Sequence, residues 1–278
     1  MANQFVKNTF GVESATKVAL LGDSVPGAWS FSDRYDSSFY DLIQYYKQRG
    51  LNIDMKDYTI TGGGYYNSRP STYTIEGWLN AAPPTTLFTG RSIDAAIAWG
   101  ATHIIVLFGS REATADNVNA NPAGGNYFGE ETIVLMEAYQ ALADTNGVDI
   151  VFTTTNASPT LLNYQDKFTA LTAVIRSKCA ELGMNYIDTY EIMTDSGTGL
   201  ARPSEYIDNV HWTRGASSGH ERWFEAAKVF FNDFFSLTTP VYDLISDTPC
   251  TDSNLVINEL TNIAVTNELT GKFVFNEA

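Results

Sequence analysis

Short apolar runs alternate with longer amphipathic stretches along most of the chain. Each run has the length of a strand, and in the stretches that follow apolar residues recur at helical spacing. The runs lie at 17–21, within 51–60, and at 103–108, 148–153 and 185–188. Apolar strands that are each followed by a helix predict a parallel sheet with helices on both of its faces.

The amphipathic stretches also carry signals for the start and end of helices. We predict helices over residues 37–49, 92–99, 130–144, 160–182 and 217–235. Ser92 is suited to cap the second of them. Gly50, Gly100 and Gly183 follow the first, second and fourth, and glycine there can adopt the left-handed conformation that ends a helix. The predicted fold class is therefore α/β, with one parallel five-stranded sheet.

Glycine and polar residues gather where the predicted strands end. These segments are 22–24, 62–64, 109–112 and 156–158. In an open parallel sheet the ligand binds at the carboxyl ends of the strands, so all four segments are expected at one edge. The loops 61–89 and 110–129 follow two of these strands and are long. Such loops often build a binding pocket, although they can also simply pack over the sheet.

Composition and charge narrow the function further. Apolar residues make up 44% of the chain and charged residues 18%, which is typical of a globular protein. The net charge of -15 disfavours binding to nucleic acid or to an anionic membrane. The first residues lack the apolar core of a signal peptide, and no run is long enough to span a membrane. We expect a soluble protein of undetermined location, with secretion or attachment to a virion left open.

The composition shifts after residue 236, so we expect two regions, 1–236 and 237–278. The second region is rich in Asn and Thr, and it contains strand-like runs at 255–257 and 273–275. We interpret it as a C-terminal extension. It could be an assembly segment that forms a homo-oligomer, a strand laid on a neighbour, or a partly disordered tail.

The three histidines have different surroundings. His103 begins an apolar strand and is expected to be structural, whereas His220 lies in a charge-rich helix and is expected to be exposed or to cap it. His211 lies between a strand and a helix, three residues after Asp208. At that spacing a carboxylate can hold one ring nitrogen of the imidazole while the other faces a nucleophile, for which Ser24 is the candidate. No cluster of His or Cys suggests a metal site.

These residues resemble the SGNH (GDSL-type) hydrolases, a family named for four short sequence blocks. LLGDS at 20–24 resembles the first block, and DNVHW at 208–212 resembles the last. Gly62 fits the second block best, with Gly63 and Gly64 as alternatives. The third block, Gly-x-Asn-Asp in the family, is Gly-Ser-Arg-Glu at 109–112 in this chain. The resemblance covers roughly residues 17–235.

The resemblance implies a three-layer α/β/α, flavodoxin-like fold and a serine esterase mechanism that needs no cofactor. Ser24 would be the nucleophile, His211 the general base, and Asp208 the residue that orients the histidine. The backbone N–H groups of Ser24 and Gly62 would form two parts of the oxyanion hole. Arg111 takes the position of the family's asparagine, which supplies the third part.

Three further residues are expected to line the binding site, namely Asp23, Tyr65 and Tyr66. Loops rich in Tyr, Trp, Asn and Thr suit a polyhydroxylated ligand. The substrate expected from them is a small-molecule or polysaccharide ester, with an O-acetyl or other short acyl group on a carbohydrate. A catalytically weak glycan-binding module of a larger surface or phage-tail-like assembly is the alternative. Nucleotide or flavin binding is disfavoured, because 62–64 lacks the glycine spacing of a phosphate-binding loop.

The replacement of asparagine by Arg111 makes one prediction. A guanidinium can donate to an oxyanion more strongly than an amide does. If Arg111 forms part of the oxyanion hole, Arg111→Ala is expected to lower kcat by about 10²-fold and to raise KM less. Steady-state hydrolysis of a short acyl ester measures both constants. An unchanged kcat would instead mean that a nearby asparagine, such as Asn117 or Asn156, takes this role.

Overall fold

The computed structural model describes most of the chain between residues 16 and 235 and three strands beyond it. The described residues are 16–27, 37–73, 87–110, 112, 127–159, 162–208, 210–215, 217–235, 256–258, 263–267 and 273–276. The chain divides into two compact units, Met1–Thr238 and Thr239–Ala278. Each unit is described by itself.

The first unit is built on a parallel five-stranded sheet with the strand order β2-β1-β3-β4-β5. Its strands are β1 (Thr16–Gly22), β2 (Ile53–Asp57), β3 (His103–Leu107), β4 (Asp149–Thr153) and β5 (Tyr186–Ile187). This is the flavodoxin-like order. Four strands lie within the segments that the sequence predicts, and β1 extends one residue beyond its predicted segment at each end. The parallel sheet is confirmed.

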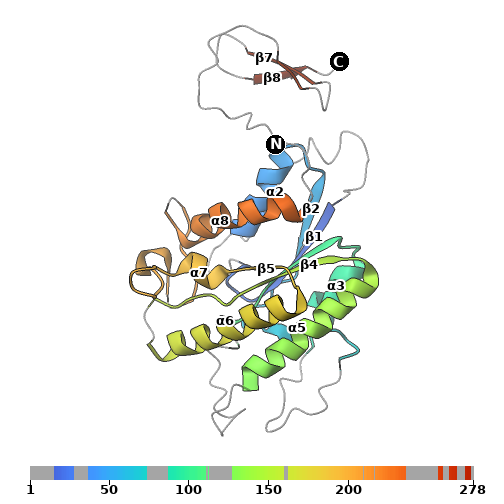
Figure 1. Cartoon of the computed structure of the whole chain (residues 1–278). Coiled ribbons are helices and arrows are strands. Elements are labelled where there is room, and N and C mark those ends of the chain that lie inside the picture. Colours follow the sequence, from blue (N-terminus) through green and yellow to red (C-terminus); the bar gives the residue numbers. More distant parts are fainter. Residues whose placement is uncertain are drawn as a thin grey trace. The chain divides into compact units, whose positions relative to one another are not determined.

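Helices cover the two faces of this sheet. They are α2 (Ser38–Gln48), α3 (Ile93–Ala98), α5 (Tyr127–Asn146), α6 (Leu162–Leu182), α7 (Thr189–Met193) and α8 (Gly219–Phe234). Figure 1 shows α2 and α8 on one face and α3, α5 and α6 on the other, which gives three layers. Three short 3₁₀ segments complete the description: η2 (Tyr65–Asn67), η3 (Thr89–Arg91) and η5 (Pro203–Glu205).

Local chemistry sets where several of these helices begin and end. The side chains of Ser37, Ser92 and Ser218 accept hydrogen bonds from the first turns of α2, α3 and α8. Gly50 and Gly100 then adopt positive φ angles of 87° and 86° directly after α2 and α3. The short α7 was not predicted, because five residues carry too little periodicity to be detected.

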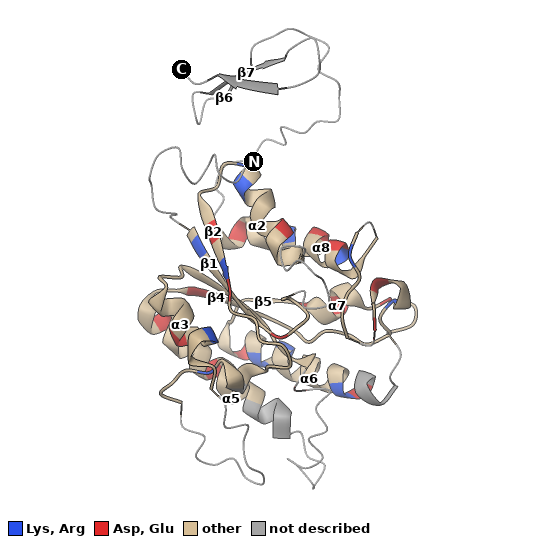
Figure 2. Ribbon diagram, turned by 180° about the vertical axis from the view of Figure 1, so that it is seen from behind, with Lys and Arg blue, Asp and Glu red and all other residues tan. Residues whose placement is uncertain are grey.

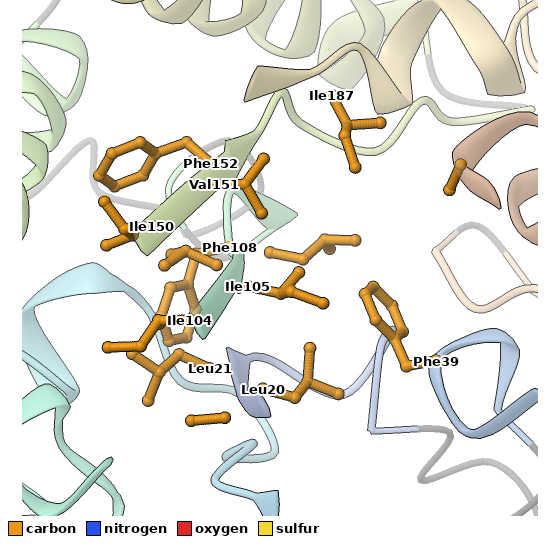
Figure 3. Packing of buried hydrophobic residues seen from close by; sticks show 14 of the residues in the cluster. Leu20, Leu21, Phe39, Ile104, Ile105, Phe108, Ile150, Val151, Phe152 and Ile187 are labelled. Carbon is orange, nitrogen blue, oxygen red and sulfur yellow. The ribbon is translucent and has the colours of Figure 1, made fainter. Parts of the chain in front are cut away.

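The core lies on both faces of the sheet. Alternate residues along neighbouring strands point to opposite faces, so aligned strands produce two apolar surfaces. Leu20, Ile105 and Val151 are in register on one face, which α2 covers with Phe39 (Figure 3). Leu21, Ile104, Ile150 and Phe152 serve the opposite face. A sheet buried on both faces explains why its strands are continuous apolar runs.

Acidic and basic residues are interspersed along the helices, for example along α2 and α8 (Figure 2). Within the part of the chain that is described, no helix combines the length and apolar character needed to cross a lipid bilayer. Cys179 is a free thiol buried in α6.

The second unit contains a three-stranded antiparallel sheet with the order β6-β7-β8. Its strands are β6 (Val256–Asn258), β7 (Ile263–Asn267) and β8 (Phe273–Asn276). Two of them overlap the predicted runs at 255–257 and 273–275, whereas β7 was not predicted. The assembly role of this region stays a prediction.

Candidate active site

Ser24 lies at the carboxyl edge of the sheet, in the turn that follows β1. The helices α2 and α5, which follow β1 and β3, lie on opposite faces of the sheet (Figure 1), so the strand order reverses between these two neighbouring strands. Gly22 allows the close approach of the turn. A Cβ atom there would lie 2.4 Å from Cγ of Pro26 and 2.7 Å from the carbonyl oxygen of Leu107. Ser24 is half-buried, between neighbours that are buried.

His211 and Asp208 reach the same edge from a loop that precedes α8. The Oγ atom of Ser24 lies 2.8 Å from Nε2 of His211, and Nδ1 of His211 lies 2.7 Å from Oδ2 of Asp208. The structure therefore brings the three residues into one hydrogen-bonded chain, although Ser24 and His211 are 187 positions apart.

The Asp208 side chain also shapes the loop that carries it. Its Oδ1 atom accepts hydrogen bonds from the backbone N–H groups of Val210 and His211, both at 2.8 Å. One carboxylate thus closes a tight turn and faces the imidazole. Partial burial opposes ionisation of Asp208, but these backbone hydrogen bonds and the bond to the imidazole outweigh it and lower its pKa. Asp208 is thereby held as an anion beside the ring.

The backbone N–H groups of Gly62, Gly63 and Gly64, the candidate oxyanion donors after β2, differ in their hydrogen bonds. Gly63 donates its N–H to the carbonyl of Ile60 at 2.9 Å, and Gly64 donates to Oδ1 of Asn67 at 3.0 Å, so both N–H groups are engaged in the turn. Gly62 has a φ of +66°. Its N–H group, unlike those of Gly63 and Gly64, donates to no other described residue. This favours Gly62 over its two alternatives.

Two residues expected near the oxyanion hole, Arg111 and Asn117, lie outside the described residues. Among the residues that are described, no three His, Cys, Asp or Glu side chains gather in a way that could hold a metal ion.

Several solved structures share this arrangement of sheet and helices. A GDSL-like lipase from Bacteroides thetaiotaomicron VPI-5482 has 14% sequence identity and a TM-score of 0.55, and the match covers 84% of this chain and 98% of that one. An acetylxylan esterase from Geobacillus stearothermophilus, in a catalytic mutant form, has 13% identity and a TM-score of 0.57 over 78% and 94% of the two chains. The lipase/acylhydrolase from Enterococcus faecalis has 14% identity and a TM-score of 0.56 over 79% and 96%.

The chain has the SGNH (GDSL-type) hydrolase fold. The sequence itself matches no protein-family model and no curated protein. At these identities the likeness establishes the fold alone. The arrangement of Ser24, His211 and Asp208 at the edge of this SGNH fold is an observation on this chain's own residues.

Two residues predicted to line the binding site of the SGNH fold are buried instead. Asp23 is 2% exposed and Tyr65 is 0% exposed, so neither presents a surface to a ligand. The ring of Tyr65 packs against Phe108 and Tyr139, because an aromatic ring at the start of η2 faces the core. The prediction for these two residues is wrong in this respect. The side chain of Tyr66 lies outside the described residues.

Two further expectations about polar side chains are corrected. His220 is 3% exposed rather than at the surface, and its Nδ1 atom lies 3.2 Å from both the backbone nitrogen and the hydroxyl of Ser38. Burial, aided by the charge of Arg214, lowers its pKa to about 3. Asn156 is also buried, at 0% exposed, and its Nδ2 atom donates to the carbonyl of Val210 at 2.6 Å, so its amide faces the loop that carries His211 and presents no surface to a ligand.

Glu112 connects the two segments that flank Ser24. The Oε1 atom of Glu112, just after β3, accepts the backbone N–H of Tyr65 at 2.7 Å. Burial raises the pKa of Glu112 to about 7, against the lowering effect of backbone hydrogen bonds, and the nearby charge of Asp23 adds to the rise. Burial likewise raises the pKa of Asp23 to about 6, although hydrogen bonds from Val25 and Ser110 lower it. The carboxyl groups of Asp23 and Glu112 are thus both buried near Ser24.

The raised pKa of Glu112 predicts that stability falls as the pH approaches neutrality. The unfolded side chain ionises near its ordinary value of 4.5, whereas the folded one keeps its proton up to about pH 7. Between these values the folded state binds more protons, so the free energy of unfolding decreases as the pH rises and levels off above them. Glu112→Gln cannot ionise, and it is expected to remove on the order of 3 kcal/mol of this decline.

Urea unfolding between pH 4 and pH 8 measures the effect. Glu225→Gln is the matched control, because Glu225 is exposed on α8. The control is expected to follow the wild-type pH dependence. If Glu112→Gln follows it too, Glu112 is ionised in the folded protein throughout this range and its assignment as a buried protonated acid is wrong.

Proposed function

We propose that this chain hydrolyses carboxylic esters with Ser24 as nucleophile, His211 as general base and Asp208 as the residue that orients the histidine. The observation that carries the proposal is the hydrogen-bonded chain of 2.8 Å and 2.7 Å through the imidazole. Nucleophile, base and orienting group at hydrogen-bond distance form the signature of an activated serine. The fold is shared with structures described as lipases, acylhydrolases and acetylxylan esterases, which supports an ester as the substrate.

The electrostatics of the three residues define the direction of proton transfer. An ionised carboxylate can only accept hydrogen bonds, so Asp208 holds the proton of His211 on Nδ1. The lone pair of Nε2 then faces the hydroxyl of Ser24, which donates to it. Oγ attacks the ester carbonyl while its proton moves to Nε2, and the imidazolium returns that proton to the leaving alcohol. Water repeats the sequence on the acyl-enzyme, which releases the acid and restores Ser24.

The oxyanion of the tetrahedral intermediate needs donors beside Ser24. The backbone N–H groups of Ser24 and Gly62 make hydrogen bonds to no other described residue, which leaves them available for this purpose. We assign them this role and keep Arg111 as the third donor. Preorganised donors at this position commonly contribute 10²–10³ in kcat each.

For the acyl group and its carrier we propose a short acyl ester, most simply an O-acetyl group, on a carbohydrate. The loops after the second and third strands are rich in Tyr, Asn and Thr, which suits sugar hydroxyls and ring faces. One structural neighbour is described as an acetylxylan esterase, and its catalytic mutants replace a serine and an aspartate by alanine. The composition of the loops and the description of this neighbour support a class of substrate, and they do not indicate a particular sugar.

Hydrolysis of p-nitrophenyl acetate by wild type and Ser24→Ala tests the reaction class. The variant lacks the nucleophile, so kcat is expected to fall by about 10³-fold or more while the fold is retained. Ser177→Ala is the matched control, since Ser177 is exposed on α6, and it is expected to keep wild-type kinetics. Turnover should also decline from the acetyl to the octanoyl ester.

Two results would contradict the proposal. Full turnover by Ser24→Ala would place the nucleophile elsewhere. The absence of turnover by wild type across several short acyl esters would instead favour the glycan-binding alternative.

A further inference from the structure

Asn156, three residues after β4, is a buried amide that makes hydrogen bonds to four described residues. Its Nδ2 atom donates to the carbonyl of Val210 at 2.6 Å. Its Oδ1 atom accepts from the hydroxyl of Tyr206 and from Nε1 of Trp212, both at 2.8 Å, and from the N–H of Ala157 at 2.9 Å. The side chain is 0% exposed. Three of its four partners therefore belong to the short loop 206–212 that carries Asp208 and His211.

The shape of that loop is fixed by bonds within it. Tyr206 and Trp212 form an antiparallel bridge, and the N–H of Ile207 donates to the carbonyl of His211 at 2.8 Å. The carboxylate of Asp208 closes the turn between them. These bonds determine how the loop is folded, but they do not determine where it lies relative to the strand that delivers Ser24.

The position of the loop depends on contacts with other elements. On the side of α8, the buried carboxylate of Glu205 accepts from Nε of Arg222 at 2.6 Å, and Trp212 stacks on Trp223. On the side of the sheet, Asn156 supplies three hydrogen bonds at the carboxyl end of β4. Ser24 belongs to the same sheet edge. The hydrogen bonds of Asn156 therefore tie the loop that carries the histidine to the sheet edge that carries Ser24.

The geometry points to Asn156 as a positioning residue that sets the distance between Ser24 and His211 by clamping the loop 206–212 to the end of β4. This inference rests on the proposed function. An amide suits the position because it donates to one carbonyl and accepts from two buried donors at once. A carboxylate lacks the donor, and an apolar side chain would remove the bonds that Asn156 makes to the Tyr206 hydroxyl, the Trp212 N–H and the Val210 carbonyl.

Asn156→Asp tests the clamp with the smallest change in shape. The aspartate can still accept from Tyr206 and Trp212, but it places a carboxylate oxygen against the carbonyl of Val210. Because small misplacements of a catalytic group are costly, we expect kcat for p-nitrophenyl acetate to fall by about 10- to 100-fold, with KM within about twofold of wild type. The melting temperature is measured in parallel.

Thr172→Val is the matched control. Thr172 is 1% exposed and its hydroxyl lies 2.7 Å from that of Thr155, so the substitution removes a buried hydrogen bond close to β4 that does not involve the loop. The control is expected to lower the melting temperature and to leave kcat unchanged. Tyr206→Phe serves if Asn156→Asp does not fold, because it removes one donor to Oδ1, and kcat is expected to fall severalfold.

A second readout separates this inference from the proposed function. The Nδ1 proton of His211, donated to Asp208, can be followed by NMR on histidine-labelled protein and assigned with His211→Gln. Asn156→Asp is expected to shift or broaden this resonance, and Thr172→Val is expected to leave it in place. If wild type hydrolyses no ester, the proposed function fails while this resonance still tests the clamp. Wild-type kcat together with an unchanged resonance in Asn156→Asp, or in Tyr206→Phe, would overturn the inference.

Discussion

The hydrogen bond between Ser24 and His211 is the contact on which the proposed activity depends, and it joins two segments that are 187 positions apart. Neither side chain is held in place by its neighbours in sequence alone. Ser24 takes its position from the end of β1, where Gly22 allows the turn to lie against Leu107. His211 takes its position from a loop that is packed between α8 and the end of β4. A reactive geometry within about 0.5 Å therefore requires the sheet edge to act as one rigid frame.

That frame includes polar side chains that are buried. Asp23, Glu112 and Asn156 are all buried at the carboxyl edge, each beside a segment that carries a site residue. Burial of a carboxyl group costs free energy and favours its protonated form, which is seen in the raised pKa values of Asp23 and Glu112. In return, Glu112 holds the backbone N–H of Tyr65 and thus joins the segments after β2 and β3. The burial of these carboxyl groups therefore costs stability at the edge of the sheet where hydrogen bonds hold the loops in place.

The sequence was sufficient for the sheet and for the three residues of the hydrogen-bonded chain, because each depends on a local signal. A strand that is buried on both faces appears in the sequence as an apolar run. A helix is often preceded by a capping serine and followed by a glycine, as Ser92 and Gly100 show for α3. Ser24 lies in a turn directly after a strand, and the spacing of Asp208 and His211 alone brings a carboxylate to an imidazole. A family resemblance then connected these two distant segments.

Residues whose surroundings come from distant segments were predicted poorly. His220 lies in a charge-rich stretch, but it is buried because α8 turns that position toward Ser38 of α2. Tyr65 faces the core because Tyr139 of α5 covers it. Nothing in the segment around Asn156 indicates that three residues of a loop some 50 positions later will bond to its amide. Such contacts depend on how distant segments pack together, and they cannot be predicted from the pattern of a single sequence.

The central claim is that Ser24 is activated by His211, and covalent trapping tests it most directly. Wild type and His211→Ala would be treated with a fluorophosphonate, which reacts with an activated serine by loss of fluoride, and the adduct would be located by mass spectrometry of peptides. We predict a single adduct on the peptide that contains Ser24, formed at least 100-fold more slowly in His211→Ala. An adduct on a different residue, or equal rates of labelling in the two proteins, would contradict the account.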